Sequence, residues 1–141
     1  MSEFNLDPTL SQDCFLLKET KHSLVLLMNN SLYHWFIIVP KASAIEWFEL
    51  DDEMQSAVMA EINKLSRWMK SDLAVDKINI ASIGNIVSQL HVHVVGRSCT
   101  DASWPAVVWG AKEKLSYTDE ELKRVKARFE SEIDFTGLSV R

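Results

Sequence analysis

Residues 89–97, with the sequence Gln-Leu-His-Val-His-Val-Val-Gly-Arg, constrain the fold more than any other part of the chain. Polar and apolar side chains alternate here. Because successive side chains of a strand point to opposite faces, the pattern predicts a half-buried β-strand over residues 89–96. One face of this strand carries Gln89, His91, His93 and Val95. The other face is expected to pack into the core under a long helix, and it carries Leu90, Val92 and Val94.

Four more strands are predicted from short apolar segments. Residues 14–18 and 23–28 flank a polar turn, which is typical of a hairpin. Residues 34–39 form an apolar run that stops at Pro40, which cannot donate to a sheet ladder. Residues 75–82 alternate in the same way as the histidine-containing strand. The chain is therefore expected to build a sheet of five strands.

Two helices are predicted from apolar stripes. The acidic pair at 51–52 suits a helix N-cap, and apolar residues then recur at steps of three and four over residues 52–72. Thr118 and Glu121 have the spacing of a capping box, and an amphipathic stretch follows them. This stretch predicts a C-terminal helix over residues 118–133.

The whole chain, residues 1–141, is expected to form a single α+β domain. A length of 141 residues is enough for one well-buried core and too short for two ordinary domains. Hydrophobic residues make up 47% and charged residues 25%, which is typical of a soluble globular protein. We find no internal repeat, low-complexity tract or linker, so the strands and helices are expected to fold together around an antiparallel sheet.

The composition and motifs disfavour several classes of function. A net charge of −5 and a pI near 5.3 argue against nucleic-acid binding through a basic face. The absence of a GxGxxG or P-loop motif argues against a dehydrogenase or kinase. No apolar run approaches the ~18 residues of a membrane span, and the first ten residues do not resemble a secretory signal, so we expect a cytoplasmic protein. Cys14 and Cys99 do not make a disulfide framework, although a single bridge stays open.

Two histidines on one face of a half-buried strand need an explanation. Taken from the residues alone, they are either a structural pair, a pair of metal ligands or a catalytic pair. A metal would require further ligands from a set with no recognisable spacing, so we expect no metal. That set comprises His22, His34, Cys14, Cys99 and the carboxylates.

The motif strand closely resembles the signature of the histidine triad (HIT) superfamily, in which three histidines alternate with hydrophobic residues. His91 matches the middle, nucleophilic histidine and His93 the third, whereas Gln89 replaces the first. The resemblance covers roughly residues 14–110, including the strand that ends in Pro-Lys and the long helix after it. The Trp-Pro and Val-Trp-Gly segments at 104–110 are similar to a bacterial branch of the family that carries this glutamine.

The resemblance implies a fold and an activity. The fold is a five-stranded antiparallel sheet with two main helices, and the sheets of two subunits join in a homodimer. The activity is hydrolysis or nucleotidyl transfer at the α-phosphate of a nucleoside monophosphate derivative. Phosphoramidates, dinucleoside polyphosphates and nucleotide sugars are the substrate types, with a purine as the better guess for the base. The reaction passes through a covalent nucleotidyl-histidine and needs no cofactor.

The resemblance also assigns the catalytic roles. His91 attacks the phosphorus while a backbone carbonyl of the motif holds its other ring nitrogen. His93 donates to a phosphate oxygen or assists the leaving group. Gln89 can hydrogen-bond to phosphate or leaving group but cannot shuttle a proton near neutral pH. The rival hypothesis is therefore a nucleotide-binding or scaffold protein with weak or lost turnover.

Four polar residues are expected to bind the substrate. Asn29 matches a position that often bonds the ribose, and Asn79 roughly matches one that approaches the α-phosphate. Ile86 stands where much of the family has a serine or threonine near the phosphate, so Asn85 and Ser88 are the candidates to replace it. A turn residue at 29 and a solvated strand residue at 79 are the alternatives.

The remaining conspicuous residues have simpler interpretations. Trp47 and Trp68 are expected in the core, His34 on the surface, and Arg97 as an ordinary solvated charge at a strand end. The tryptophans of segment 104–109 are expected to close over the site or to pack at a dimer interface. The charges at 112–114 and 123–128 are expected to be solvated.

Overall fold

The computed structural model describes residues 3–136, so the ends of the predicted 1–141 domain lie outside the described residues. The strands are β1 (Cys14–Glu19), β2 (Ser23–Met28), β3 (His34–Pro40), β4 (Lys77–Ala81) and β5 (Val92–Arg97). The helices are α1 (Pro8–Asp13), α2 (Asp52–Ser71) and α3 (Asp119–Glu132), with a short 3-10 turn η1 (Trp47–Glu49). Five strands and two main helices were predicted, and all seven form within a few residues of the predicted bounds.

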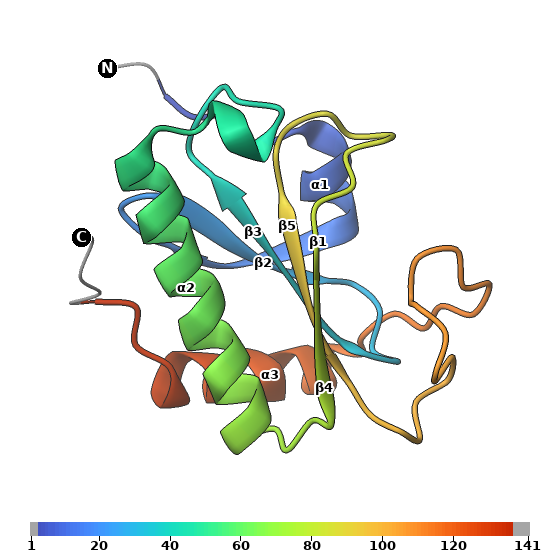
Figure 1. Ribbon diagram of the computed structural model, residues 1–141. Helices are drawn as coiled ribbons and strands as arrows, with labels where there is room; N and C mark the ends of the chain where they lie inside the picture. The colour runs from blue at the N-terminus through green and yellow to red at the C-terminus, as the bar shows by residue number, and fades with distance from the viewer. Residues whose placement is uncertain (1–2, 137–141) are drawn as a thin grey trace.

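The five strands form one antiparallel sheet in the order β1-β2-β3-β5-β4 (Figure 1). The first three strands follow one another as neighbours, and β5 then inserts between β3 and β4. The motif strand β5 is therefore an interior strand with a partner on each side, while β4 lies at an edge. This confirms the predicted α+β class with a five-stranded antiparallel sheet.

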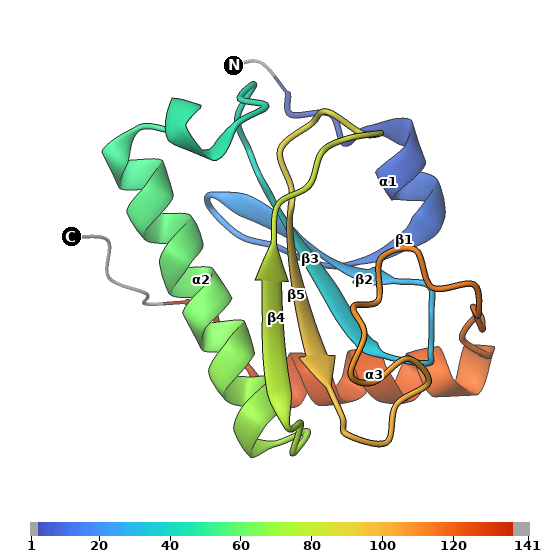
Figure 2. The same cartoon turned by 45° about the vertical axis from the view of Figure 1, so that its right-hand side comes forward.

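Helix α2 covers one face of the sheet. Its apolar residues recur with the period of a helix, so they form one stripe that is buried against the strands. The Asp51 side chain caps its N-terminus by accepting from Met54 N at 2.8 Å. The buried residues of the helix include Val58, Ile62, Leu65, Trp68 and Met69. Figure 2 shows α2 on one side of the sheet and α1, with the loop that follows β5, on the other.

Helix α3 begins at the predicted capping box, in which Thr118 and Glu121 bond reciprocally. Its buried Phe129 packs against Phe36 of β3 and Trp68 of α2, with ring centroids 6.2 and 5.7 Å away. Helix α1 was not predicted, because six residues are too few to show a helical period.

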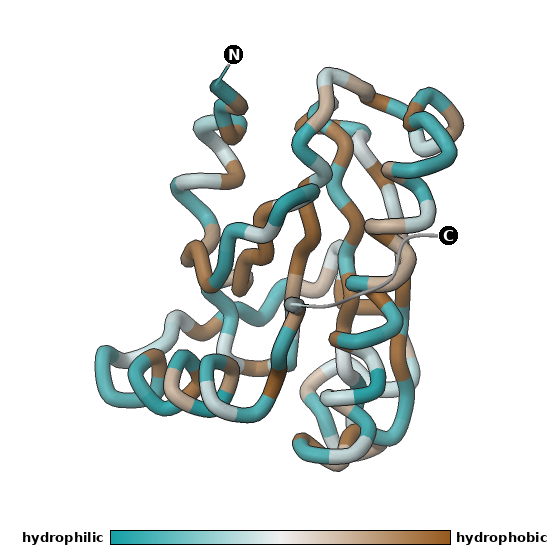
Figure 3. The backbone as a smooth tube through the Cα atoms, turned by 90° about the vertical axis from the view of Figure 1, so that its left-hand side faces the viewer, coloured by the Kyte–Doolittle hydropathy of each residue, from teal (hydrophilic) through white to brown (hydrophobic). Residues whose placement is uncertain are grey.

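The sheet separates two apolar clusters, and the two faces of β5 contribute to different ones. Val92 and Val94 join the cluster under α2, as predicted. Val95 joins the other cluster, together with Leu10 of α1 and Trp35 of β3. Figure 3 shows the hydrophobic strands in the middle of the molecule. The alternation predicted for the motif strand therefore decides which side chains face α1 and the loop after β5.

Arg97, at the end of β5, is not the solvated charge that was expected; it is only 1% exposed. Its Nε donates to Asp101 Oδ2 at 2.8 Å and its Nη2 to Asp101 Oδ1 at 3.0 Å. Nη1 donates to Asn79 Oδ1 at 3.0 Å. The guanidinium also lies over the rings of Tyr33 and Trp104, at 5.7 and 5.6 Å from their centroids. Burial is possible because these groups satisfy the charge.

The Arg97–Asp101 pair fixes the start of the loop that follows β5. Burial raises the pKa of the Asp101 carboxyl, but hydrogen bonds from Arg97 and from two backbone amides outweigh that effect and lower it. The amides belong to Ser98 and Ser103, at 3.2 Å each. One buried carboxylate thus holds both ends of the turn 98–103 against the sheet.

We predict that Arg97→Ala destabilises the fold by about 3–5 kcal/mol, because it leaves the Asp101 carboxylate buried without its cation. Urea unfolding followed by circular dichroism measures the change. Arg67→Ala, at an exposed position of α2, is the matched control and is expected to stay within about 0.5 kcal/mol. A loss below about 1 kcal/mol at Arg97 would mean that the pair behaves like a surface salt bridge.

Candidate active site

His91 lies directly before β5 and is held by the backbone of its own segment. Its Nδ1 is 2.7 Å from the carbonyl oxygen of Gln89. A carbonyl oxygen can only accept, so Nδ1 carries the proton and Nε2 of the neutral ring carries the free lone pair. His91 is buried and lines a cavity. The arrangement presents an imidazole lone pair as a potential nucleophile.

His93 has the opposite tautomer. The indole N–H of Trp35 donates to its Nδ1 at 3.0 Å, so the neutral ring carries its proton on Nε2. Burial lowers the pKa of His93 to about 4, and the nearby His91 contributes to the shift. A protonated ring would carry a hydrogen on both nitrogens, and Nδ1 could then no longer accept from the indole. His93 is therefore a neutral hydrogen-bond donor at neutral pH.

Two tryptophan rings pack around His93, and the ring of His91 packs against it. The ring centroids of His91 and His93 are 5.0 Å apart, and Trp109 lies 5.3 Å from His93 and 6.0 Å from Trp35. The indole nitrogen of Trp109 is buried and has no hydrogen-bond partner among residues 3–136. Trp109 was expected to close over the site or to pack at a dimer interface, and within the chain it lies against His93 and Trp35.

Both histidines line a cavity of about 510 Å³. Besides the histidine segment, its wall comes from five parts of the chain: helix α1, the end of β2 with the turn after it, strand β3, the loop before the motif and the segment after Trp104. The side chains that give it polar character are Thr9, Asp13, Asn30, Asn85, Glu113 and Lys114. The volume fits a small organic ligand. Lys114, on an exposed stretch as predicted, supplies the cation at the rim.

The loop that leads into the motif forms one side of the cavity. Residues 83–87 line it, among them the predicted Asn85, and Gly84 has a positive φ of 68°. Ile86, where the family has a hydroxyl residue, is 96% exposed. Ser88 is exposed and does not line the cavity.

Gln89 does not point into the cavity. Its Oε1 accepts from Asp7 N at 2.8 Å and its Nε2 donates to the carbonyl of Asn5 at 2.9 Å. The strand starts at Val92, three residues later than predicted, so Gln89 precedes it. A contact between this amide and a substrate would require the bonds to Asn5 and Asp7 to open.

The two other predicted asparagines, Asn29 and Asn79, do not line this cavity. Asn29 accepts from Tyr117 N at 2.9 Å and does not line the cavity, whereas its neighbour Asn30 does. Asn79 bonds Arg97 and lines a different cavity. Sequence reasoning missed Asn30, and the only signal was its place beside Asn29 in the same turn.

Among residues 3–136 there is no group of three or more His, Cys, Asp or Glu side chains that could hold a metal ion. None of the helices in that range has the length and apolarity needed to span a membrane.

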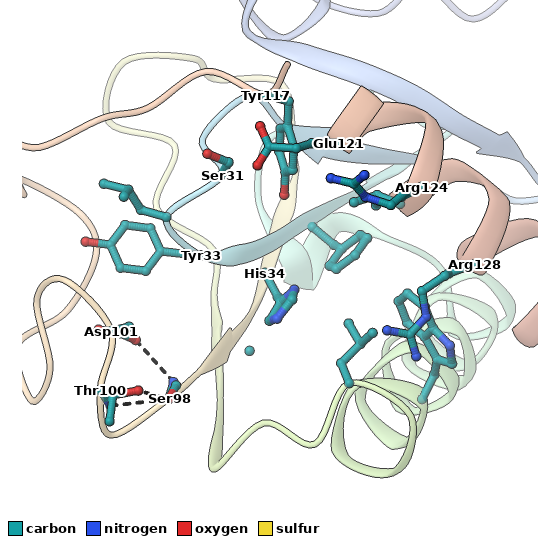
Figure 4. A pocket seen from close by; sticks show the side chains of 16 residues that line it. Ser31, Tyr33, His34, Ser98, Thr100, Asp101, Tyr117, Glu121, Arg124 and Arg128 are labelled. Carbon is teal, nitrogen blue, oxygen red and sulfur yellow. Dashed lines mark hydrogen bonds between the residues drawn. The ribbon is translucent and has the colours of Figure 1, made fainter. Parts of the chain in front are cut away.

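A second cavity, of about 540 Å³, lies between α3 and the ends of β3 and β5 (Figure 4). His34 lines it from β3, and Tyr117, Arg124 and Arg128 surround it. His34 and Phe36 alternate with Trp35, so this cavity opens on the α2 face of the sheet, opposite His93. Arg128 is already bonded to Glu132 at 3.0 Å. The chemistry of the histidine pair belongs to the first cavity.

The chain is similar to known proteins in sequence and in fold. The HIT domain family matches residues 9–100. A histidine triad protein from Bradyrhizobium japonicum is 34% identical, with a TM-score of 0.89 over 93% of this chain and 98% of that one. One from Marinobacter aquaeolei VT8 is 38% identical, with a TM-score of 0.87 over 91% and 94%. One from Sinorhizobium meliloti 1021 is 35% identical, with a TM-score of 0.88 over 92% and 97%. A comparison with curated proteins finds no match.

We predict that Trp35→Phe raises the pKa of His93 above its value of about 4, because Nδ1 then becomes free to take a proton. NMR titration of the imidazole ring measures this, and Trp47→Phe, at a half-buried tryptophan of η1, is the control.

The lowered pKa of His93 also makes the free energy of unfolding depend on pH. The pKa of His93 in the folded chain lies below the ordinary histidine value of 6.5, so the unfolded chain takes up its proton first as the pH falls. The free energy of unfolding is expected to drop from about pH 6.5 to about pH 4, and less so in Trp35→Phe. An unchanged His93 titration in Trp35→Phe would show that the indole bond does not control the tautomer.

Proposed function

Since the chain belongs to the HIT domain family, we propose that it hydrolyses or transfers nucleotides at the α-phosphate through a nucleotidyl intermediate on His91. The observation that carries this proposal is the bond from His91 Nδ1 to the Gln89 carbonyl. It leaves the Nε2 lone pair as the reactive group of a buried imidazole that lines a ligand-sized cavity.

In the first step, His91 Nε2 attacks the α-phosphorus of a nucleoside monophosphate derivative. A nitrogen–phosphorus bond forms, and the bond from phosphorus to the leaving group breaks, with the electron pair going to the leaving group. The Gln89 carbonyl stabilises the imidazolium that forms, because its bond to Nδ1–H becomes charge-assisted. The Nε2–H of His93 is available to donate to a phosphate oxygen.

In the second step, water or an acceptor phosphate attacks the same phosphorus and the nitrogen–phosphorus bond breaks. The electron pair returns to His91 Nε2, so the nucleophile is regenerated with its original tautomer. With water, the products are a nucleoside monophosphate and a proton. Neither step requires a cofactor.

Nucleoside phosphoramidates, dinucleoside polyphosphates and nucleotide sugars all fit this chemistry. Lys114 at the cavity rim and the polar groups of Asn30 and Asn85 are the described side chains that can meet phosphate and ribose. The alternative function, nucleotide binding without useful turnover, is favoured by one observation: Gln89 is bonded to backbone and offers no acid.

We predict that His91→Ala reduces hydrolysis of adenosine 5′-phosphoramidate by several orders of magnitude, because the nucleophile is lost. Adenosine monophosphate release measures the rate. His34→Ala, on the other face of the sheet, is the control and is expected to keep the wild-type rate.

Mass spectrometry of the wild type, quenched in alkaline denaturant because the nitrogen–phosphorus bond is acid-labile, is expected to find a nucleotidyl group on the peptide that contains His91. Wild-type rates in contaminant-free His91→Ala would refute the mechanism. Nucleotide binding by an inactive wild-type protein would favour the binding function instead.

We also propose that the protein is a homodimer joined through β4. This strand lies at the edge of the sheet, so the outer side of its backbone has no partner strand within residues 3–136. Exposed edge strands are templates for pairing with another chain. The apolar residues exposed on and near it are Ile80, Ile83, Ile86 and Val107.

We predict that Ile80→Lys converts this dimer to a monomer, because it places a charge on the edge strand. Light scattering at micromolar concentration measures the mass. Ile45→Lys is the control, because Ile45 is equally exposed (53% against 54%) but lies in the loop after β3. A wild-type protein that is monomeric at this concentration would remove the proposal.

A further inference from the structure

The side-chain amide of Gln89 is bonded on both of its polar atoms to the N-terminal segment. It accepts from Asp7 N at 2.8 Å and donates to the Asn5 carbonyl at 2.9 Å. These partners are more than eighty residues away in sequence, so the bonds are tertiary contacts. A glutamine at this position therefore joins two distant parts of the chain.

An imidazole cannot replace this amide. The oxygen and nitrogen of an amide leave the same carbon side by side, and together they match one backbone acceptor and one backbone donor. A neutral imidazole also has one donor and one acceptor, but they lie on opposite sides of the ring. A histidine at position 89 would therefore lose at least one of the bonds to Asn5 and Asp7.

The segment that Gln89 holds is a wall of the catalytic cavity. Asp7 caps helix α1 by accepting from Thr9 N at 2.8 Å, so the bond to Asp7 N fixes the beginning of that helix. Thr9, Leu10 and Asp13 of α1 line the cavity with the two histidines. The far end of α1 is fixed by the bond from Asn29 N to the Asp13 carbonyl, at 3.0 Å.

The same residue also holds the nucleophile. The backbone carbonyl of Gln89 bonds His91 Nδ1 at 2.7 Å while its side chain bonds the N-terminal segment. A shift of the wall is thus transmitted to the residue that orients the nucleophile. A six-residue helix has little stability of its own, so its position depends on such contacts.

We propose that Gln89 is a positioning residue that braces helix α1 as a fixed wall of the cavity, and that this wall determines how tightly the nucleotide is held. The part about the nucleotide rests on the proposed function. On this proposal, the residue that replaces the first histidine of the motif acts on the shape of the site and not on the leaving group.

The proposed role of Gln89 in holding helix α1 is tested without any substrate, by amide hydrogen exchange of the full-length protein. Gln89→Met removes both bonds at similar size, Gln89→His removes at least one, and Gln89→Glu keeps the acceptor for Asp7 N. We expect the α1 amides to exchange roughly tenfold faster or more in Gln89→Met, and by a smaller factor in Gln89→Glu. Gln12→Met, at an exposed position of α1, is the control. Unchanged exchange of α1 in Gln89→Met would overturn the proposal.

The effect on the site is tested by the dissociation constant of adenosine monophosphate and by a leaving-group series of adenosine phosphoramidates and phosphoesters. We expect Gln89→Met and Gln89→His to weaken binding and raise KM several-fold, with a smaller change in kcat and no change in its dependence on leaving-group pKa. A general acid lost or gained would change that dependence, typically by ~10²–10⁴-fold for basic leaving groups.

The two proposals fail in different ways. If Gln89→His accelerates substrates with basic leaving groups while α1 exchange stays at the wild-type rate, Gln89 acts on the leaving group and the brace is wrong. If α1 exchanges faster in Gln89→Met but the wild type neither binds nor turns over an adenosine nucleotide, the proposed function is wrong. The claim that α1 determines nucleotide affinity is then wrong as well, while the role of Gln89 in holding α1 stands.

Discussion

The antiparallel pairing of β3 with β5 is the constraint on which the whole site depends. Its register places Ile37 opposite His93 and Trp35 opposite Val95, so the Trp35 indole reaches the His93 ring diagonally. A slip by one residue would turn both histidines toward α2 and bring valines to the cavity. Apolar contacts on both faces oppose such a slip, since Val92 and Val94 pack under α2 while Val95 packs near α1. The register of an apolar sheet thus determines where the chemistry is located.

The same face of β5 accommodates two polar groups by different means. Arg97 keeps its charge in the interior because Asp101 supplies a carboxylate and Asn79 an amide oxygen. No carboxylate within residues 3–136 forms an ion pair with His93, and burial keeps its ring neutral. A fixed charge therefore anchors the loop at one end of the strand, while at the other end the neutral donor His93 lies beside His91, the proposed nucleophile. Arg97 and His93 can both be buried because each has a hydrogen-bond partner within the chain.

Features that depend on residues close together in the sequence were predicted well, and features that depend on distant residues were not. Helix α2 and the alternating strands depend on local periods and are predicted nearly to their bounds. The burial of Arg97 was missed, because a strand-end arginine gives no sign that Asp101 and Tyr33 enclose it. Helix α1 has no readable period, and the partners of Gln89 are more than eighty residues away. Residues whose role depends on a distant backbone atom, as Asn30 and Gln89 do, could not be placed from a pattern.

On the proposed mechanism a basic leaving group needs a proton, and Gln89, whose amide is bonded to Asn5 and Asp7, does not supply it. Within the described residues, the neutral His93 holds a proton on Nε2 next to His91, but giving it up would leave an imidazolate in a buried site, which burial disfavours. Solvent entering the cavity is then the remaining source. A site built in this way suits leaving groups that depart as stabilised anions, such as nucleotides and phosphates, better than basic amines. On the two proposals together, Gln89 shapes the site, and the preference among leaving groups follows from the lack of an acid beside the proposed nucleophile His91.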